Sequence, residues 1–230
     1  MRPIVFHLAD ESMERGLKAF FRRSNWHHAM GCARFEIDPE SSRDIYRISG
    51  HNPALNPFRN DPGIHQHAHE NLATHLNTHQ RAVIILDESF GGSPGAAGLR
   101  DEIAHNMRNS GWSDERFEIV VIQPMLEAWL FADNVNVAHA FGFSDFASLQ
   151  QPLIERGLWK PGQPKPEPTK LKEAKIVALK SGGKSRLGTS PFPKLFELIS
   201  SRACNACLEP GFRQMRSRLQ QWFPAEGRVS

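Results

Sequence analysis

Three short runs of apolar residues, each followed by polar or acidic residues, constrain the fold of this chain more than any other sequence feature. The runs cover residues 4–8, 82–86 and 117–122, and the last of them contains Glu118. They are too short for buried helices and rich in β-branched residues, so they predict strands that are buried on both faces. A further strand is expected near residues 43–48.

Helical patterns separate these runs. Apolar residues recur at Met13, Leu17, Phe20 and Phe21, which lie on one face of a helix over 13–23. A second helix is expected over 96–109, after the breaker segment 91–95, and a third over 125–133, just after Pro124. Strands that alternate with helices are typical of an α/β protein with a mostly parallel sheet.

The rest of the chain divides by composition. Residues 24–81 predict an irregular excursion, and the proline-rich segment 160–168 predicts a stiff linker. Three basic helical segments are expected after the linker, over 169–180, 193–202 and 211–223. We therefore expect an α/β core over 1–150 and a basic helical extension over 151–230, packed together as one compact unit.

Charge follows the same division. The net charge of +3 combines 13 basic and 19 acidic residues up to position 150, net −6, with 15 basic and 6 acidic residues after it, net +9. An acidic half beside a basic half fits a carboxylate metal site next to a phosphate-binding surface. Two solvated faces of opposite sign are the alternative.

The general composition excludes several classes of protein. A chain of 230 residues with 40% apolar and 23% charged residues is long enough for one hydrophobic core. It contains no run of about 20 apolar residues that would cross a bilayer, and its beginning lacks a secretory cleavage site. Its 3 cysteines build no disulfide framework. We expect a cytoplasmic protein with no membrane partner.

Acidic residues follow the predicted strands. Glu11 and Asp87 come just after the first two apolar runs, and Glu127 lies about one turn into the helix after the third. The carboxyl ends of parallel strands meet at one edge of the sheet, so these carboxylates are expected to converge there. Mg²⁺ is held by one or two such carboxylates together with water and substrate phosphates. Helix capping is the alternative role for each of them.

The residues around these carboxylates resemble the TOPRIM-like proteins of bacterial and phage-defence loci. That family is related to the OLD-family nucleases, and many of its members are classed only as a domain of unknown function. The resemblance rests on Glu11 after its strand, on the Asp87-x-Ser89 end of the second strand, and on the segment 123–133, which contains Glu127-Ala-Trp129. It continues through 167–172, 183–188 and 203–213.

The resemblance implies a Rossmann-like TOPRIM domain that holds Mg²⁺ or Mn²⁺. Glu11 takes the role of general acid or base, and Asp87 is a metal ligand. Ser89 stands where the family has a second aspartate and offers only a neutral oxygen. Glu88 or Glu127 then supplements the metal site, and the catalytic set is Glu11, Asp87 and Glu127.

The implied function is a Mg²⁺-dependent nuclease or a nucleic-acid-processing subunit of an anti-phage defence system. Two alternatives remain open. The first is a non-catalytic subunit that uses the same fold to bind nucleic acid or a partner ATPase of the defence complex. The second is a toxin-like effector held silent by a partner.

Two further groups of side chains are candidates for binding a ligand. Basic residues suited to phosphate contacts stand at Lys170, Lys172, Lys184 and Arg186, with a solvated basic helix as the alternative. On a helix, His65 with His69 and His75 with His79 would each share one face at a spacing that binds zinc or nickel. A polar helix or loop is the alternative for the histidines.

Overall fold

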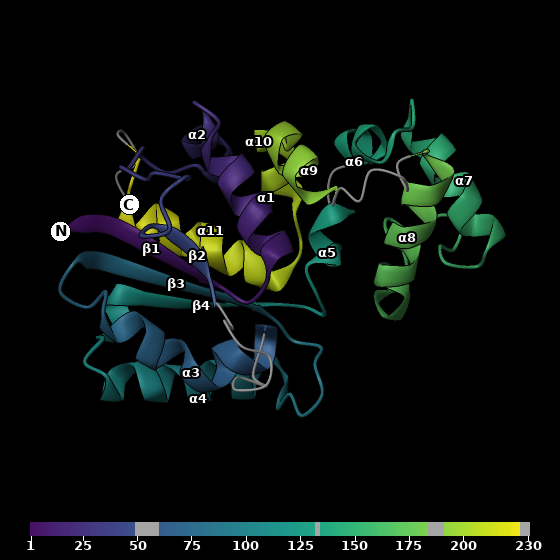
Figure 1. The fold of residues 1–230 in the computed structure, drawn as a ribbon. Helices are drawn as coiled ribbons and strands as arrows, with labels where there is room; N and C mark the ends of the chain where they lie inside the picture. The colour runs from purple at the N-terminus through teal and green to yellow at the C-terminus, as the bar shows by residue number, and fades with distance from the viewer. Residues whose placement is uncertain (49–59, 132–133, 184–190, 226–230) are drawn as a thin grey trace.

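A four-stranded parallel sheet lies at the centre of the computed structural model, which describes residues 1–48, 60–131, 134–183 and 191–225 (Figure 1). The strands are β1 (Arg2–Leu8), β2 (Ile45–Arg47), β3 (His79–Asp87) and β4 (Phe117–Ile122). Their order is β2-β1-β3-β4, and every pairing is parallel. The predicted strands and the parallel α/β architecture, which is that of a Rossmann-like fold, are confirmed.

Burial explains why these segments form strands. Every residue of β4 is buried, as are the residues of β1 from position 4 and of β3 from position 82. Leu8 pairs with Ile85, and Asp87 pairs with Ile122, so the carboxyl ends of β1, β3 and β4 lie at the same edge of the sheet.

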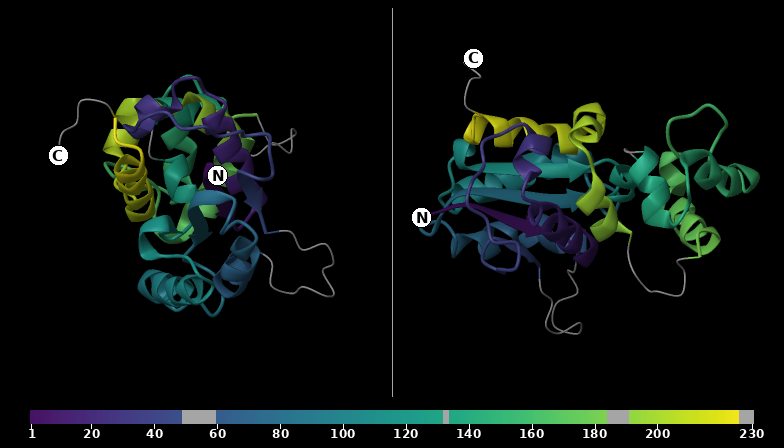
Figure 2. Two further views of the ribbon diagram at one scale, coloured as in Figure 1. Left: turned by 90° about the vertical axis from the view of Figure 1, so that its left-hand side faces the viewer. Right: turned by 90° about the horizontal axis from the view of Figure 1, so that it is seen from above.

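Helices cover both faces of the sheet (Figures 1 and 2). One face carries α1 (Glu11–Phe21) and α11 (Pro210–Trp222), and the other carries α3 (Asn60–Ala73) and α4 (Gly95–Asn109). Three shorter helices lie on the side of α1: α2 (Trp26–Met30), α9 (Phe192–Leu198) and α10 (Ser201–Ala206). Of these, α9 packs on α1, and α10 packs on α2.

A second group of helices lies beyond the carboxyl ends of the strands (Figure 1). It consists of α6 (Asn134–Phe141), α7 (Phe146–Glu155) and α8 (Leu171–Ser181), and α5 (Glu127–Leu130) leads into it from β4. The short 3₁₀ helix η2 (Pro168–Lys170) precedes α8, and η1 (Asp114–Arg116) precedes β4. A Cβ atom at Gly182, just after α8, would lie 1.8 Å from the carbonyl oxygen of Phe141, so only glycine allows this approach to α6.

Three sequence predictions differ from this fold. The helix expected over 125–133 has two residues, 132 and 133, outside the described residues, and in the part described it forms as the four-residue α5. The helix expected over 193–202 is divided into α9 and α10. The excursion over 24–81 contains α2 and the long helix α3. The buried residues Ile64, Ala68 and Leu72 of α3 are spaced by four, but the histidines between them hide the apolar pattern.

The division expected at residue 150 falls within α7. The chain after this point does not form one separate layer, because α8 belongs to the group beyond the strands whereas α11 packs on β4. Among the described residues, no helix has the length and apolar character needed to cross a bilayer. All three cysteines are buried.

Candidate functional site

The carboxyl edge of the sheet contains a topological switch point, which lies between β1 and β3. From the central strand β1 the chain moves outward to β2, and from β3 it moves outward to β4 on the other side. Ligands of open α/β sheets bind at such a point, outside the carboxyl ends of the strands. Asp87 is the last residue of β3, and Asp10 follows β1 by two positions.

Asp87 is a buried carboxylate of this edge. Its exposed fraction is 7%, and its Oδ1 atom is buried without a hydrogen-bond partner. Burial is the main reason why the pKa of Asp87 lies well above its ordinary value, and the neighbouring carboxylates of Asp61, Asp10 and Glu127 raise it further. The backbone N–H of Leu126 acts in the opposite direction. An unpartnered oxygen among like charges is a position that a cation would stabilise.

Asp61 lies in the first turn of α3 and contacts β3 directly. The backbone N–H of Asp87 donates to Asp61 Oδ1 at 2.7 Å. Burial raises the pKa of Asp61 to about 6, Asp10 raises it too, and the hydrogen bond from Asp87 and the charge of Lys172 lower it. A carboxyl group with a pKa of about 6 exchanges its proton near neutral pH, as general acid–base chemistry requires.

Asp10 caps α1 and also faces the other carboxylates. Its Oδ1 accepts from the backbone N–H of Met13 at 2.8 Å, as an N-cap residue does. Burial is the main cause that raises the pKa of Asp10, and Glu127 adds to it, while the backbone N–H groups of Met13 and Ser12 and the charge of Lys175 lower it.

Glu127 is neutralised by a lysine from the distant helix α8. Lys175 Nζ lies 2.5 Å from Glu127 Oε1, and the Glu127 side chain is buried. The same ammonium lies 5.4 Å from the centre of the Phe192 ring. The ion pair therefore joins the α6–α8 group to the edge of the sheet and brings a positive charge to the carboxylates.

The other carboxylates predicted for the site lie differently. Glu11 is the first residue of α1, its side chain is 59% exposed, and its Oε1 lies 3.6 Å from Arg15. Glu88 Oε1 accepts from the backbone N–H of Ala96 at 3.0 Å, at the beginning of α4. Ser89 is exposed, and its backbone N–H donates to the carbonyl oxygen of Pro124. The structure thus brings Asp87 and Glu127 together but leaves Glu11 facing solvent.

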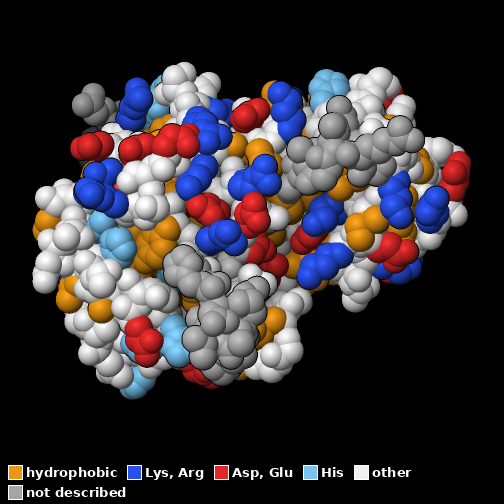
Figure 3. Space-filling view, in the orientation of Figure 1, with side chains coloured by type: hydrophobic (Ala, Val, Ile, Leu, Met, Phe, Trp, Pro, Cys, Tyr) orange, Lys and Arg blue, Asp and Glu red, His pale blue; other side chains and the backbone are white. Residues whose placement is uncertain are grey.

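Two of the four predicted phosphate-binding residues, Lys184 and Arg186, lie outside the described residues. Lys170 Nζ donates to the carbonyl oxygen of Gly157 at 2.8 Å and so stabilises a local turn. Lys172 is exposed and acts on the pKa of Asp61. Figure 3 shows basic and acidic side chains interspersed over the middle of this face of the molecule.

The tryptophan of the Glu127-Ala-Trp129 motif is buried and has a structural role. Its Nε1 donates to Glu209 Oε2 at 2.7 Å. Glu209 also accepts from the backbone N–H groups of Gln123, Gly211 and Phe212. This buried carboxylate fixes the beginning of α11 against the segment that leads to Glu127.

Sequence reasoning missed three residues of the site. Asp10 directly precedes Glu11, the residue that the family pattern indicates. Asp61 lies in the segment predicted to be irregular. Lys175 lies within the basic run whose predicted partners are phosphates rather than a carboxylate. The Asp61-Pro62 pair, typical of a helix beginning, is the signal that could have revealed Asp61.

The carboxylates do not form a complete metal cage. Across the described segments, no group of three or more His, Cys, Asp and Glu side chains is arranged to hold a metal ion. Lys175 engages Glu127, and Asp61 engages the Asp87 backbone, whereas Asp87 Oδ1 is buried without a hydrogen-bond partner. This donor set fits Mg²⁺ bound through one or two carboxylates with water in its other positions. Comparisons with family models, curated proteins and solved structures find no match to this chain.

Proposed function

We propose that this protein is a TOPRIM-like, Mg²⁺-dependent enzyme of phosphodiester hydrolysis that acts on nucleic acid in a bacterial defence system. The supporting observation is the unpartnered Oδ1 of Asp87, buried among three other carboxylates at the switch point of the sheet. Mn²⁺ is the expected substitute. The class of reaction is proposed from the sequence resemblance, and the carboxylate cluster supports this edge of the sheet as the proposed location.

Asp87 would hold the metal in this proposal, and Glu127 would be the second carboxylate available to it. A bound Mg²⁺ would supply charge stabilisation to a phosphoryl group. Lys172 and Lys175 contact the phosphate oxygens in this proposal, since these two residues of α8 lie beside the carboxylates. Their position allows one anionic substrate to contact the edge of the sheet and α8 together.

Proton transfer is assigned to Asp61. Its pKa of about 6 lets the carboxylate accept a proton near neutral pH and return it later in the reaction. The resemblance assigns this role to Glu11, whose exposed carboxylate pairs with Arg15. The two assignments predict different inactive variants.

A second candidate function is favoured by the Glu127–Lys175 ion pair. A lysine that neutralises the second carboxylate lets the fold persist without a metal. In that case the protein is a non-catalytic subunit that binds nucleic acid or a partner ATPase through the same edge.

A metal titration decides between these functions. We would measure Mg²⁺ and Mn²⁺ binding to the tag-free protein by calorimetry and, in parallel, cleavage of supercoiled plasmid, single-stranded DNA and RNA. Asp87→Asn is the test variant. Asp101→Asn, an exposed carboxylate of α4, is the matched control.

Saturable binding and cleavage that Asp87→Asn abolishes and Asp101→Asn retains would support the enzyme. If the wild-type protein neither binds metal nor cleaves any substrate, the enzyme proposal is wrong and the binding function takes its place.

A further inference from the structure

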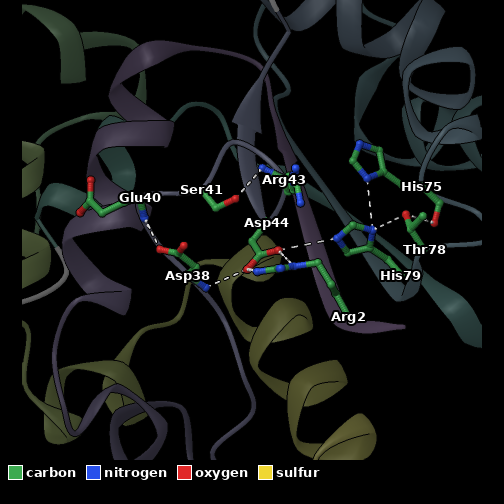
Figure 4. A network of polar contacts seen from close by, with 9 residues as sticks. All are labelled: Arg2, Asp38, Glu40, Ser41, Arg43, Asp44, His75, Thr78 and His79. Carbon is green, nitrogen blue, oxygen red and sulfur yellow. Dashed lines mark hydrogen bonds and ion pairs between the residues drawn. The ribbon is translucent and has the colours of Figure 1, made fainter.

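Two histidine rings face each other at the end of the sheet opposite to Asp87. His75 follows α3, and His79 is the first residue of β3 (Figure 4). Their Nδ1 atoms are 3.2 Å apart, and the rings are inclined by 64°. Of the two histidine pairs that the sequence singles out, this one brings two ring nitrogen atoms within hydrogen-bonding distance of each other. His65, by contrast, contacts Glu102 of α4 at 2.7 Å.

The separation of the two nitrogens suits a shared metal ion. Zinc lies about 2.0–2.1 Å from a ligating imidazole nitrogen, so two such nitrogens in a tetrahedral site are roughly 3.3 Å apart. Thr78 Oγ1 lies 2.9 Å from His79 Nδ1 and adds an oxygen from an exposed residue. The open positions would be taken by water.

The other ring nitrogen of His79 faces a carboxylate. Asp44 Oδ1 lies 3.7 Å from His79 Nε2, and the Asp44 side chain is only 1% exposed. Asp44 is fixed by Arg2, whose guanidinium donates to Oδ2 at 2.6 Å, and by the backbone N–H of Asp38 at 2.7 Å. A carboxylate behind a ligating histidine, on the nitrogen away from the metal, orients the ring and increases its basicity.

We propose that His75 and His79 form a two-nitrogen site for a borderline transition-metal ion, Zn²⁺ or Ni²⁺, with Thr78 and water completing the coordination and Asp44 orienting His79. Such a metal would join the turn after α3 to the first residue of β3. The site is independent of the carboxylate cluster, because it lies at the amino end of β3 whereas Asp87 lies at the carboxyl end.

The test is a titration of the tag-free full-length chain with Zn²⁺ and Ni²⁺ against a chromophoric chelator. His75→Gln is the primary variant because His75 is half-buried, whereas His79 is buried and its replacement endangers folding. His65→Gln, from the other histidine pair, is the matched control. We expect one ion per chain, loss of this binding in His75→Gln, and unchanged binding in His65→Gln.

A second measurement examines the role of Asp44 without removing a ligand. Asp44→Asn is expected to weaken the metal affinity by roughly tenfold while the stoichiometry stays at one. Cu²⁺ added to the wild-type protein should give an absorption band of nitrogen coordination that His75→Gln lacks. Absence of binding to the wild-type protein, equal binding in His75→Gln, or loss of binding in His65→Gln would each overturn the proposal.

Discussion

The backbone N–H of Asp87 donates to the carboxylate of Asp61, which fixes the end of β3 to the first turn of α3. This contact places two carboxylates side by side at the switch point, where burial raises the pKa of both. The arrangement disfavours the doubly ionised form, and a cation or a proton relieves the repulsion. The ionisation of this pair therefore links stability, metal binding and the proposed chemistry.

Stability without metal is expected to fall as the pH rises through about 6. The pKa of Asp61 is raised from 3.8 to about 6, so its contribution to stability is complete below pH 3.8 and is lost above the folded value. Asp87 acts in the same direction. Denaturant unfolding between pH 5 and 8 should show a loss on the order of 1–3 kcal/mol. Asp61→Asn should flatten this slope, Asp101→Asn should leave it unchanged, and a flat wild-type profile would contradict the assignment.

His7→Phe is expected to stabilise the protein and to remove part of its sensitivity to acid. His7 is fully buried in β1, neither ring nitrogen has a hydrogen-bond partner, and burial lowers its pKa from 6.5 to about 3. The wild-type protein therefore loses stability as the pH falls below 6.5 towards 3. Phenylalanine keeps the ring contact with Tyr46 and removes two unpaired polar atoms, a gain of about 1–3 kcal/mol. Denaturant midpoints at pH 7 and 5 measure both effects; a less stable variant with the same acid slope would refute this account.

Proton transfer by Asp61 and by Glu11 can be separated with three variants. Asp61→Asn should abolish cleavage, whereas Glu11→Gln should leave it within about twofold of the wild type, because Glu11 faces solvent. Asp10→Asn keeps a residue that caps α1 and tests only the charge of Asp10. Initial rates at saturating Mg²⁺ give the comparison. An inactive Glu11→Gln beside an active Asp61→Asn would return the role to Glu11.

Gly182→Ala is expected to destabilise the contact between α8 and α6 by about 2–4 kcal/mol. The added methyl group would overlap the carbonyl oxygen of Phe141, which is backbone and cannot move independently. Gly91→Ala is the control, because a Cβ atom there meets nothing within 4 Å. Thermal unfolding of the two variants measures the difference. Equal midpoints would show that α6 and α8 can move apart at little cost in stability, which would contradict the prediction.

Trp129→Phe should cost about 1–3 kcal/mol, since it leaves an oxygen of the buried Glu209 without its indole donor. Trp222→Phe provides the comparison, because the Trp222 indole donates to the Glu115 carbonyl oxygen at an exposed position. Chemical denaturation of both variants gives the two free energies of unfolding. A larger loss in Trp222→Phe would show that the Glu209 contact is not the main stabilising bond.

The features that could be predicted from the sequence are those that a local pattern of residues determines. The strands were predicted because strands buried on both faces form continuous apolar runs, which are visible in the sequence itself. The helix α3 was missed because histidines surround its buried positions. Asp87 and Glu127 were predicted because each follows a strand, whereas Lys175 reaches Glu127 from a part of the chain far away in sequence. Only the packing of α8 brings them together.

The strand order β2-β1-β3-β4 has a consequence for how this chain folds during synthesis. The strand synthesised first, β1, pairs with two strands that are synthesised later. Its hydrogen bonds to them can form only after residues 45–47 and 79–87 have been synthesised. The helix α11, which covers one face of β4, begins only at Pro210, after the whole α6–α8 group has emerged. Long-range pairing of this kind slows folding and leaves apolar strand surface uncovered in the nascent chain. A ribosome-bound chain stopped before residue 210 would thus present the uncovered face of β4 to chaperones.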